Sequence, residues 1–289
     1  MRLLSDDAGK HEKPIPVLLR LIVKISERFP AFRRWAWKRW YQHIAGYTVA
    51  SWSFMNYGFE SLDAESARLE LQQDDEDDRF CIQLYHQVAN AVELAGRNVL
   101  EVGSGRGGGA SYVARYLSPS SMTGVDFSAK AVSFCRSRHN VDGLKFVVGD
   151  AENLPFEDGS VDAVVNVESS HCYGSMPAFL QQVYRVLSTD GHFLYTDFRA
   201  ADEIDMLEEQ LQSAGFTFVE QHDITANVVQ AMTLDNQRKQ DLIRNHISGW
   251  LAMTFQQFAG VEDSEVLQSF RDRAFVYKRY VLRKAVARK

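Results

Sequence analysis

The sequence predicts an α/β protein with a mostly parallel sheet that helices cover on both faces. From Asn98 onward, short runs rich in β-branched and aromatic residues alternate with runs of helical periodicity, which is the pattern of parallel strands joined by crossover helices. The first strand runs into the glycine-rich segment "GSGRGGG" at 103–109, and a turn of this kind lets backbone N–H groups approach a nucleotide. We therefore expect a nucleotide-binding α/β domain.

The elements follow in order along the chain. Strands are predicted over 98–102, 121–126, 144–148, 161–167, 191–197, 216–224 and 274–284, and helices over 79–94, 108–117, 128–139, 175–187 and 202–214. About fifty residues separate the last two strands, and their helical periodicity favours a helical insertion over a structureless loop. The predicted division is a helical cap or substrate lid over 1–78, a cofactor-binding core over 79–225, an insertion that caps the substrate over 226–270, and a final core strand within 271–289.

The segment 15–54 differs from the rest of the chain. It is rich in Lys and Arg, holds four of the five tryptophans, and has a helical periodicity that is broken at Pro30. Two interpretations stay open. These helices either pack on the main domain with solvated basic faces, or contact a membrane surface or a lipid-like substrate. The acidic run at 74–78 is expected to be a solvated helix start.

Composition narrows the function classes. The chain has 289 residues, 45% hydrophobic residues and a formal net charge of −6, and this acidic balance argues against a nucleic-acid partner. Three cysteines without C-x-x-C spacing suggest neither a zinc site nor a disulfide framework, and no metal is expected. No run of about 18 apolar residues occurs. A cytoplasmic protein is expected, at most peripheral to a membrane through its N-terminal helices, and a homodimer is left open.

The glycines alone leave two cofactor classes open. Gly103, Gly105 and Gly108 also satisfy G-x-G-x-x-G, so a nicotinamide dinucleotide must be considered. Asp126 ends the second strand, 21 residues after Gly105, and is placed to accept from both ribose hydroxyls of an adenosine. That position fits either cofactor.

Acids at two further strand ends distinguish the cofactors. Asp150 closes the third strand, where a carboxylate can accept from the adenine amino group while Ala151 and Phe127 flank the ring. Glu101 lies two residues before the first glycine, where a dinucleotide carries pyrophosphate. A carboxylate repels pyrophosphate but attracts a cationic amino-acid tail. The sequence therefore predicts S-adenosyl-L-methionine, whose sulfonium and ammonium are both positive.

These residues resemble the motifs of the class I S-adenosylmethionine-dependent methyltransferases. The resemblance covers roughly 98–200 and combines E-x-G-x-G-x-G, the acid of the second strand and G-D-A-x-x-L-P-F. It implies a Rossmann-like sheet of seven strands in the order 3-2-1-4-5-7-6, with strand 7 antiparallel. It also implies contacts of the methionine part with Gly103, Ser104 and Gly105, of its amino group with Glu101, of the ribose with Asp126, and of the adenine with Asp150 and Ala151. Arg106 is expected to point to solvent.

Two strand ends carry the expected substrate chemistry. His171 follows the fourth strand and Asp197 ends the fifth, and these strands are neighbours in the family's sheet, so their tips are expected about 5–10 Å apart. The carboxylate would fix the imidazole tautomer while the other ring nitrogen takes the proton of a substrate hydroxyl. The alternatives are a histidine that only lines the pocket and an acid that ends the strand for structural reasons. Glu168 is assigned to the cofactor site and Cys172 to packing.

The segments "ESSHCY" and "YTDF" are similar to small-molecule O-methyltransferases of natural-product pathways. The layout, with "FMNYGF" at 54–59, resembles the phthiotriol and phenolphthiotriol dimycocerosate methyltransferases more closely. This resemblance implies methyl transfer to a hydroxyl of a hydrophobic polyketide or lipid, with Tyr57 over the cofactor and His171 as general base. The alternatives are C-methylation or cyclisation of an olefinic or prenyl substrate with the same cofactor, and a binding protein that keeps the fold.

Overall fold

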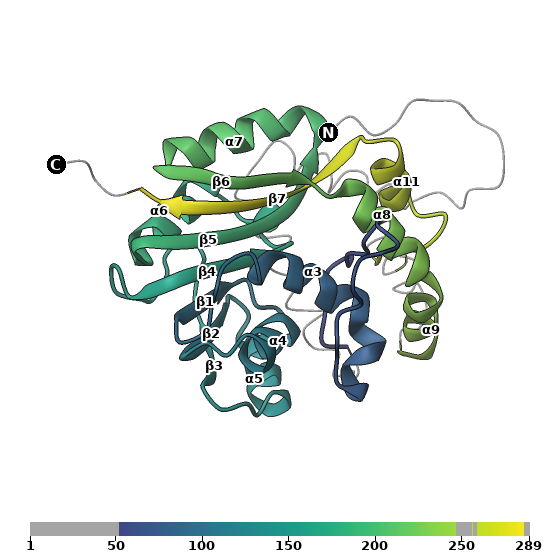
Figure 1. The fold of residues 1–289 in the computed structure, drawn as a ribbon, viewed down its shortest axis with the longest axis horizontal. Helices are drawn as coiled ribbons and strands as arrows, with labels where there is room; N and C mark the ends of the chain where they lie inside the picture. The colour runs from purple at the N-terminus through teal and green to yellow at the C-terminus, as the bar shows by residue number, and fades with distance from the viewer. Residues whose placement is uncertain (1–51, 247–255, 257–258, 286–289) are drawn as a thin grey trace.

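A computed structural model of the chain describes residues 52–246, 256 and 259–285. One seven-stranded sheet has the order β3-β2-β1-β4-β5-β7-β6 (Figure 1). The strands are β1 Asn98–Val102, β2 Ser121–Asp126, β3 Leu144–Val148, β4 Val161–Val167, β5 Leu187–Ala200, β6 Phe216–Asp223 and β7 Phe275–Lys284. Strand β7 pairs antiparallel with β5 and β6, and the other neighbours pair parallel. The predicted fold class, strand order and reversed last strand are confirmed.

Helices cover both faces of this sheet, which separates two hydrophobic cores. The helices are α3 Arg79–Ala89, α4 Gly108–Tyr116, α5 Ala129–Arg138, α6 Met176–Val186, α7 Ile204–Ser213, α8 Thr225–Leu234, α9 Asn236–His246 and α11 Glu265–Arg271. One core holds residues of α3, α4, α5, α8 and α11, and the other holds residues of α6 and α7. Val99 and Leu100, successive on β1, belong to opposite cores because side chains alternate along a strand.

The predicted helical insertion between the last two strands is present as α8, α9 and α11. These helices gather at one end of the sheet (Figure 1), and α11 packs on α8. The insertion's role as a substrate cap stays a prediction. The predicted helices of the basic segment lie within 15–51, outside the described residues. Among the helices that the structure does describe, none combines the length and apolar character needed to cross a bilayer.

Two elements, β5 and α3, differ from the sequence prediction by three or more residues at an end. Strand β5 covers Leu187–Ala200 instead of 191–197, because α6 leads directly into it and its final residues pair with β7 as far as Ala200 opposite Phe275. Its first residue, Leu187, pairs with Val161 before a register shift between the two strands, in which the extra residues lie in β5. Helix α3 stops at Ala89 instead of continuing to 94.

The acidic run at 74–78 is more buried than predicted. It forms a 3₁₀ helix, η1 Gln73–Asp78, that precedes α3. Asp75 accepts from Arg115 of α4 at 2.7 Å, and Asp78 accepts from Arg238 of α9 at 3.0 Å. Side-chain exposure is only 13% for Asp75 and 19% for Asp78. A solvated run is therefore the wrong interpretation for these two carboxylates, which join η1 to two other helices.

Candidate active site

The glycine-rich loop follows β1 and is shaped by backbone conformations that favour glycine. Gly103 has a φ of 77° and Gly105 a φ of 53°, both in the left-handed region. The loop is held against β2, where the Gly105 N–H donates to Asp126 Oδ2 at 2.9 Å and the Ser128 N–H donates to Asp126 Oδ1 at 2.8 Å. Asp126 thus orients the loop through one oxygen, and each of its oxygens has the capacity to accept a further hydrogen bond.

Glu101 is a deeply buried acid near the carboxyl end of β1. It is 1% exposed, and its Oε1 accepts from the Tyr85 hydroxyl at 2.6 Å. Burial raises the pKa of the Glu101 carboxyl to about 7, although the hydrogen bond from Tyr85 opposes that rise. The second oxygen, Oε2, has no partner within the described part of the chain. A buried acceptor without a donor costs free energy, so this atom marks a place where a donor belongs.

The residues predicted for the adenine follow β2 and β3. These strands pair parallel up to Asp126 opposite Val148, so Phe127 and Asp150 leave the sheet at the same edge. Asp150 Oδ1 accepts from the Glu152 N–H at 3.0 Å, and Ala151 is buried. Phe127 is 36% exposed, a large apolar ring open to solvent on one side.

His171 and Asp197 form the pair that the sequence predicts. His171 lies in η2 Ser170–Cys172, directly after β4, and its Nδ1 is 2.8 Å from Asp197 Oδ1 on β5. The His171 backbone N–H also donates to Asp197 Oδ2 at 3.0 Å. Two contacts between the same residues fix both the position of the loop and the orientation of the ring.

Asp197 is an ionised carboxylate in a fully buried position. Besides His171, it accepts from Ser170 Oγ at 2.5 Å and from Arg199, whose Nη1 lies 3.1 Å from Oδ2. Burial alone would raise the pKa of Asp197, but the charges of His171 and Arg199 hold it well below its usual range. Burial disfavours the imidazolium of His171, yet the neighbouring Cys172 and Asp197 together raise the pKa of His171 well above its usual value.

Glu168 lies between this pair and the segment that carries Tyr57. Its φ is 47°, a conformation that non-glycine residues rarely adopt and that is concentrated at functional sites. Glu168 Oε1 accepts from the Tyr57 backbone N–H at 2.9 Å and from the Tyr277 hydroxyl at 2.6 Å. Burial raises the pKa of Glu168 to about 7. The Tyr57 ring packs on Phe198, 5.7 Å between centroids, and Phe198 stacks 4.6 Å from His171.

Comparison with known proteins agrees with this arrangement. A family model described as a methyltransferase domain matches residues 100–195. The phthiotriol/phenolphthiotriol dimycocerosates methyltransferase of Mycobacterium leprae (strain TN) is 37% identical over 247 residues, which are 84% of this chain and 90% of that protein. The chain belongs to the class I S-adenosylmethionine-dependent methyltransferases. The cofactor predicted from the acids and glycines, S-adenosylmethionine, follows from that membership.

Two further similarities concern this methyltransferase. The fatty-acid O-methyltransferase of Mycolicibacterium smegmatis (strain ATCC 700084 / mc(2)155) is 46% identical over 179 residues, which are 62% of this chain and 65% of that protein. The crystal structure of the cyclase SpnF superposes with a TM-score of 0.65 at 20% identity, covering 88% of this chain and 96% of that one. The second similarity supports the fold alone.

The sheet edge of the methyltransferase fits the cofactor's amino-acid part. Two buried polar atoms without a partner in the described ranges lie close together in the sequence, at and just after the end of β1: Glu101 Oε2 and Ser104 Oγ. A carboxylate and a hydroxyl oxygen accept hydrogen bonds, and an ammonium supplies three donors. Asn166 joins β4 to β1 from the other face of the sheet, because its Nδ2 donates to Val102 O at 2.8 Å. The polar atoms left unpaired are therefore those that a cationic amine would satisfy.

Arg106 is a correction to the sequence prediction. It was expected to point to solvent, but it is 3% exposed. Its guanidinium carbon lies 3.9 Å from the ring centroid of Phe134 on α5, and its Nε donates to the Trp52 carbonyl. The Gly108 N–H donates to the next carbonyl, Ser53 O, at 3.1 Å. The long side chain covers apolar surface and joins the glycine-rich loop to the segment that begins at Trp52.

The sequence analysis did not identify several residues of the site. Tyr85 and Tyr277 come from α3 and β7, outside the motif region, and no local signal connects them to Glu101 or Glu168. Arg199 does carry a signal, since it is two residues from Asp197 on one strand and therefore shares its face.

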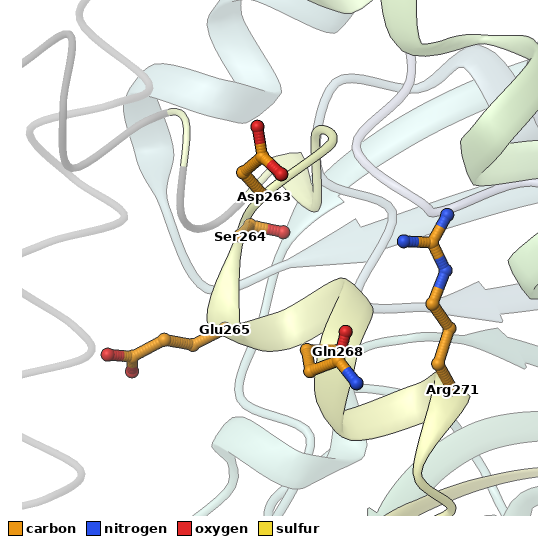
Figure 2. A pocket seen from close by; sticks show the side chains of 5 residues that line it. All are labelled: Asp263, Ser264, Glu265, Gln268 and Arg271. Carbon is orange, nitrogen blue, oxygen red and sulfur yellow. The ribbon is translucent and has the colours of Figure 1, made fainter. Parts of the chain in front are cut away.

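One pocket of the described part of the chain shares no residue with the strand ends discussed above. Figure 2 shows it along α11, lined by Asp263, Ser264, Glu265, Gln268 and Arg271. Arg271 already pairs with Glu262 at 2.8 Å, and we assign this pocket no role in the chemistry.

Proposed function

We propose that this methyltransferase methylates an oxygen of a hydrophobic, lipid-like small molecule, with His171 as general base. The observation that carries the proposal is the contact of 2.8 Å between His171 Nδ1 and Asp197 Oδ1 at the ends of neighbouring strands. The names of two similar proteins, a dimycocerosates methyltransferase and a fatty-acid O-methyltransferase, support a lipid acceptor.

The proposed cofactor site uses the ends of the first four strands. S-adenosylmethionine supplies an electrophilic methyl group on a sulfonium. Glu101, with Gly103, Ser104 and Gly105, would hold the amino-acid part, Asp126 the ribose, and Asp150, Ala151 and Phe127 the adenine. Glu168 and Tyr57, joined by the hydrogen bond of 2.9 Å, belong to the same proposed set.

The proposed acceptor chemistry depends on the imidazole tautomer. A proton on His171 Nδ1, held by Asp197, leaves the basic lone pair on Nε2, which would take the proton of the acceptor hydroxyl. A general base contributes about 10²–10⁴-fold, whereas positioning of the reactants supplies up to about 7–11 kcal/mol. Loss of His171 should therefore slow the reaction without abolishing it.

The surroundings of His171 favour an apolar acceptor. The rings of Phe198, Tyr57 and Phe270 lie in mutual contact beside it, with centroid separations of 5.5–5.7 Å. A charged head group would lose hydration against these rings. The sequence-based proposals of a lipid-facing or membrane-facing N-terminal region, and of a homodimer, concern residues and contacts beyond the described ranges.

The test is methyl transfer from labelled S-adenosylmethionine to a panel of hydroxylated lipids and long-chain fatty acids. His171→Gln should lower kcat by about 10²–10⁴-fold and leave cofactor affinity unchanged. His222→Gln is the matched control, because His222 lies on β6 with 54% of its side chain exposed. Full activity of His171→Gln, with loss of activity on substitution of Phe198, would favour C-methylation or cyclisation of an olefinic substrate over O-methylation.

A further inference from the structure

Tyr85 is a buried side chain that reaches the cofactor edge from outside the motif region. It lies on α3, is 6% exposed, and donates to Glu101 Oε1 over 2.6 Å. Helix α4 packs closely against the Tyr85 ring, because a Cβ placed on Gly109 would come within 1.9 Å of the Tyr85 Cε1 atom. The Phe54 ring closes a further side of the Tyr85 ring at 5.9 Å. Tyr85 therefore has one available orientation, and in that orientation its hydroxyl meets Glu101.

We infer that Tyr85 is a positioning residue for the cofactor: it holds Glu101 by one oxygen and leaves the other to accept from the cofactor's ammonium. The inference rests on the proposed role of Glu101 in the cofactor site. Among the described residues, Oε1 has the tyrosine as its side-chain donor and Oε2 has no partner. A carboxylate that is hydrogen-bonded through one oxygen holds the second oxygen in a fixed direction, and this lowers the entropic cost of binding the ligand.

Tyr85 also stabilises the charged form of Glu101. A hydroxyl that donates to a carboxylate favours ionisation, and an ionised Glu101 is needed to attract an ammonium. Three elements face this carboxyl: Tyr85 from α3, the Ala110 backbone N–H from α4, and Asp126 from β2, whose negative charge opposes ionisation. Burial raises the pKa of Tyr85 itself well above its usual value, so the phenol stays a donor across the physiological range. Removal of its hydroxyl should move the onset of cofactor binding to higher pH.

The experiment compares two ligands by calorimetry on the full chain. S-adenosylhomocysteine carries the amino-acid tail, and 5′-methylthioadenosine shares the adenosine but lacks that tail. Tyr85→Phe keeps the ring that α4 is packed around and should raise the Kd for S-adenosylhomocysteine about 10-fold, the expected loss for a hydrogen bond to a charged group. Its Kd for 5′-methylthioadenosine should not change.

A matched control removes another buried tyrosine hydroxyl, one that joins α3 to α4. The Tyr112 hydroxyl of α4 lies 2.6 Å from His86 Nδ1 of α3 and does not touch Glu101. Tyr112→Phe should bind both ligands as the wild type does. If Tyr85→Phe weakens the binding of both ligands equally, Tyr85 acts only through packing and the inference is wrong. Unchanged affinity for S-adenosylhomocysteine would also overturn the inference.

Two further measurements separate this inference from the role of Glu101. In a Glu101→Gln background, Tyr85→Phe should cause little additional loss of S-adenosylhomocysteine affinity, because both substitutions act on one contact. Unchanged binding by Glu101→Gln alone would instead refute the proposed cofactor site. For the wild type, affinity for S-adenosylhomocysteine should fall as pH decreases from about 8 to about 6, while affinity for 5′-methylthioadenosine stays level. In Tyr85→Phe, or in Gly109→Ala if the first variant does not fold, this fall should begin at higher pH than in the wild type, and an unchanged onset would contradict the inference.

Discussion

Replacing Asp197 by Asn should both destabilise the protein and slow methyl transfer. The carboxylate has 0% side-chain exposure and serves two cations, His171 at 2.8 Å and Arg199 at 3.1 Å. An amide offers one acceptor oxygen in place of two and carries no charge. Because Asp197 helps to raise the pKa of His171, the imidazole loses its proton more readily in the variant. Arg199 cannot, and it stays buried without its counter-ion.

The size of the effect follows from that unpaired cation. Removing one partner of a buried ion pair costs about 3–5 kcal/mol, a large part of a total stability of about 5–15 kcal/mol. His171→Gln leaves Asp197 paired with Arg199 and removes one hydrogen bond to a charged group, so it should cost about 1.5–3 kcal/mol. The double variant Asp197→Asn/Arg199→Met removes both charges and should recover part of the loss, because no buried charge is then unpaired.

The assay is equilibrium unfolding in denaturant, with labelled methyl transfer measured on the same preparations. The expected order of stability is wild type, His171→Gln, then Asp197→Asn, with the double variant above Asp197→Asn. An Asp197→Asn protein as stable as His171→Gln, or a double variant no better than Asp197→Asn, would refute the assignment of Asp197 as the shared partner of two buried cations.

Three further outcomes are expected. The rate of methyl transfer should rise with pH above about 6.5, because His171 must be unprotonated and Asp197 raises its pKa; in Asp197→Asn the rise should move to lower pH. Gly109→Ala should displace the Tyr85 ring, lowering the melting temperature and weakening S-adenosylhomocysteine binding in calorimetry. Arg106→Ala should destabilise by about 1–3 kcal/mol in denaturant unfolding, because it removes packing and a hydrogen bond that join the glycine-rich loop to the segment at Trp52.

The fold and the pairing of His171 with Asp197 could be predicted because the sequence signals for both are local. A strand that runs into a glycine-rich turn is visible in a dozen residues, and parallel strands bring their carboxyl ends to one edge. Pairing of β4 with β5 therefore brings His171 and Asp197 together, whatever the intervening sequence. The length of β5 could not be predicted in the same way, since its last residues are extended only because β7 pairs with them.

The residues that hold the acids could not be predicted because they arrive from distant parts of the chain. Tyr85 precedes Glu101 by a helix and a loop, and Tyr277 follows Glu168 by 109 residues. Nothing in the sequence around either tyrosine indicates its partner. Arg106 was mispredicted for a related reason: a charged residue in a glycine-rich loop is usually solvated, and only the fold shows that Phe134 and Trp52 enclose it.

The position of β7 has a consequence for synthesis of the protein. Strand β6 has no neighbour other than β7, although it is translated about fifty residues earlier. While the nascent chain is still on the ribosome, β1 to β5 can pair among themselves, but β6 has no strand to pair with until β7 has been translated. Glu168 lacks its tyrosine until the same moment, because Tyr277 arrives on β7. Completion of the sheet and completion of the hydrogen bonds of Glu168 are thus one event, late in translation.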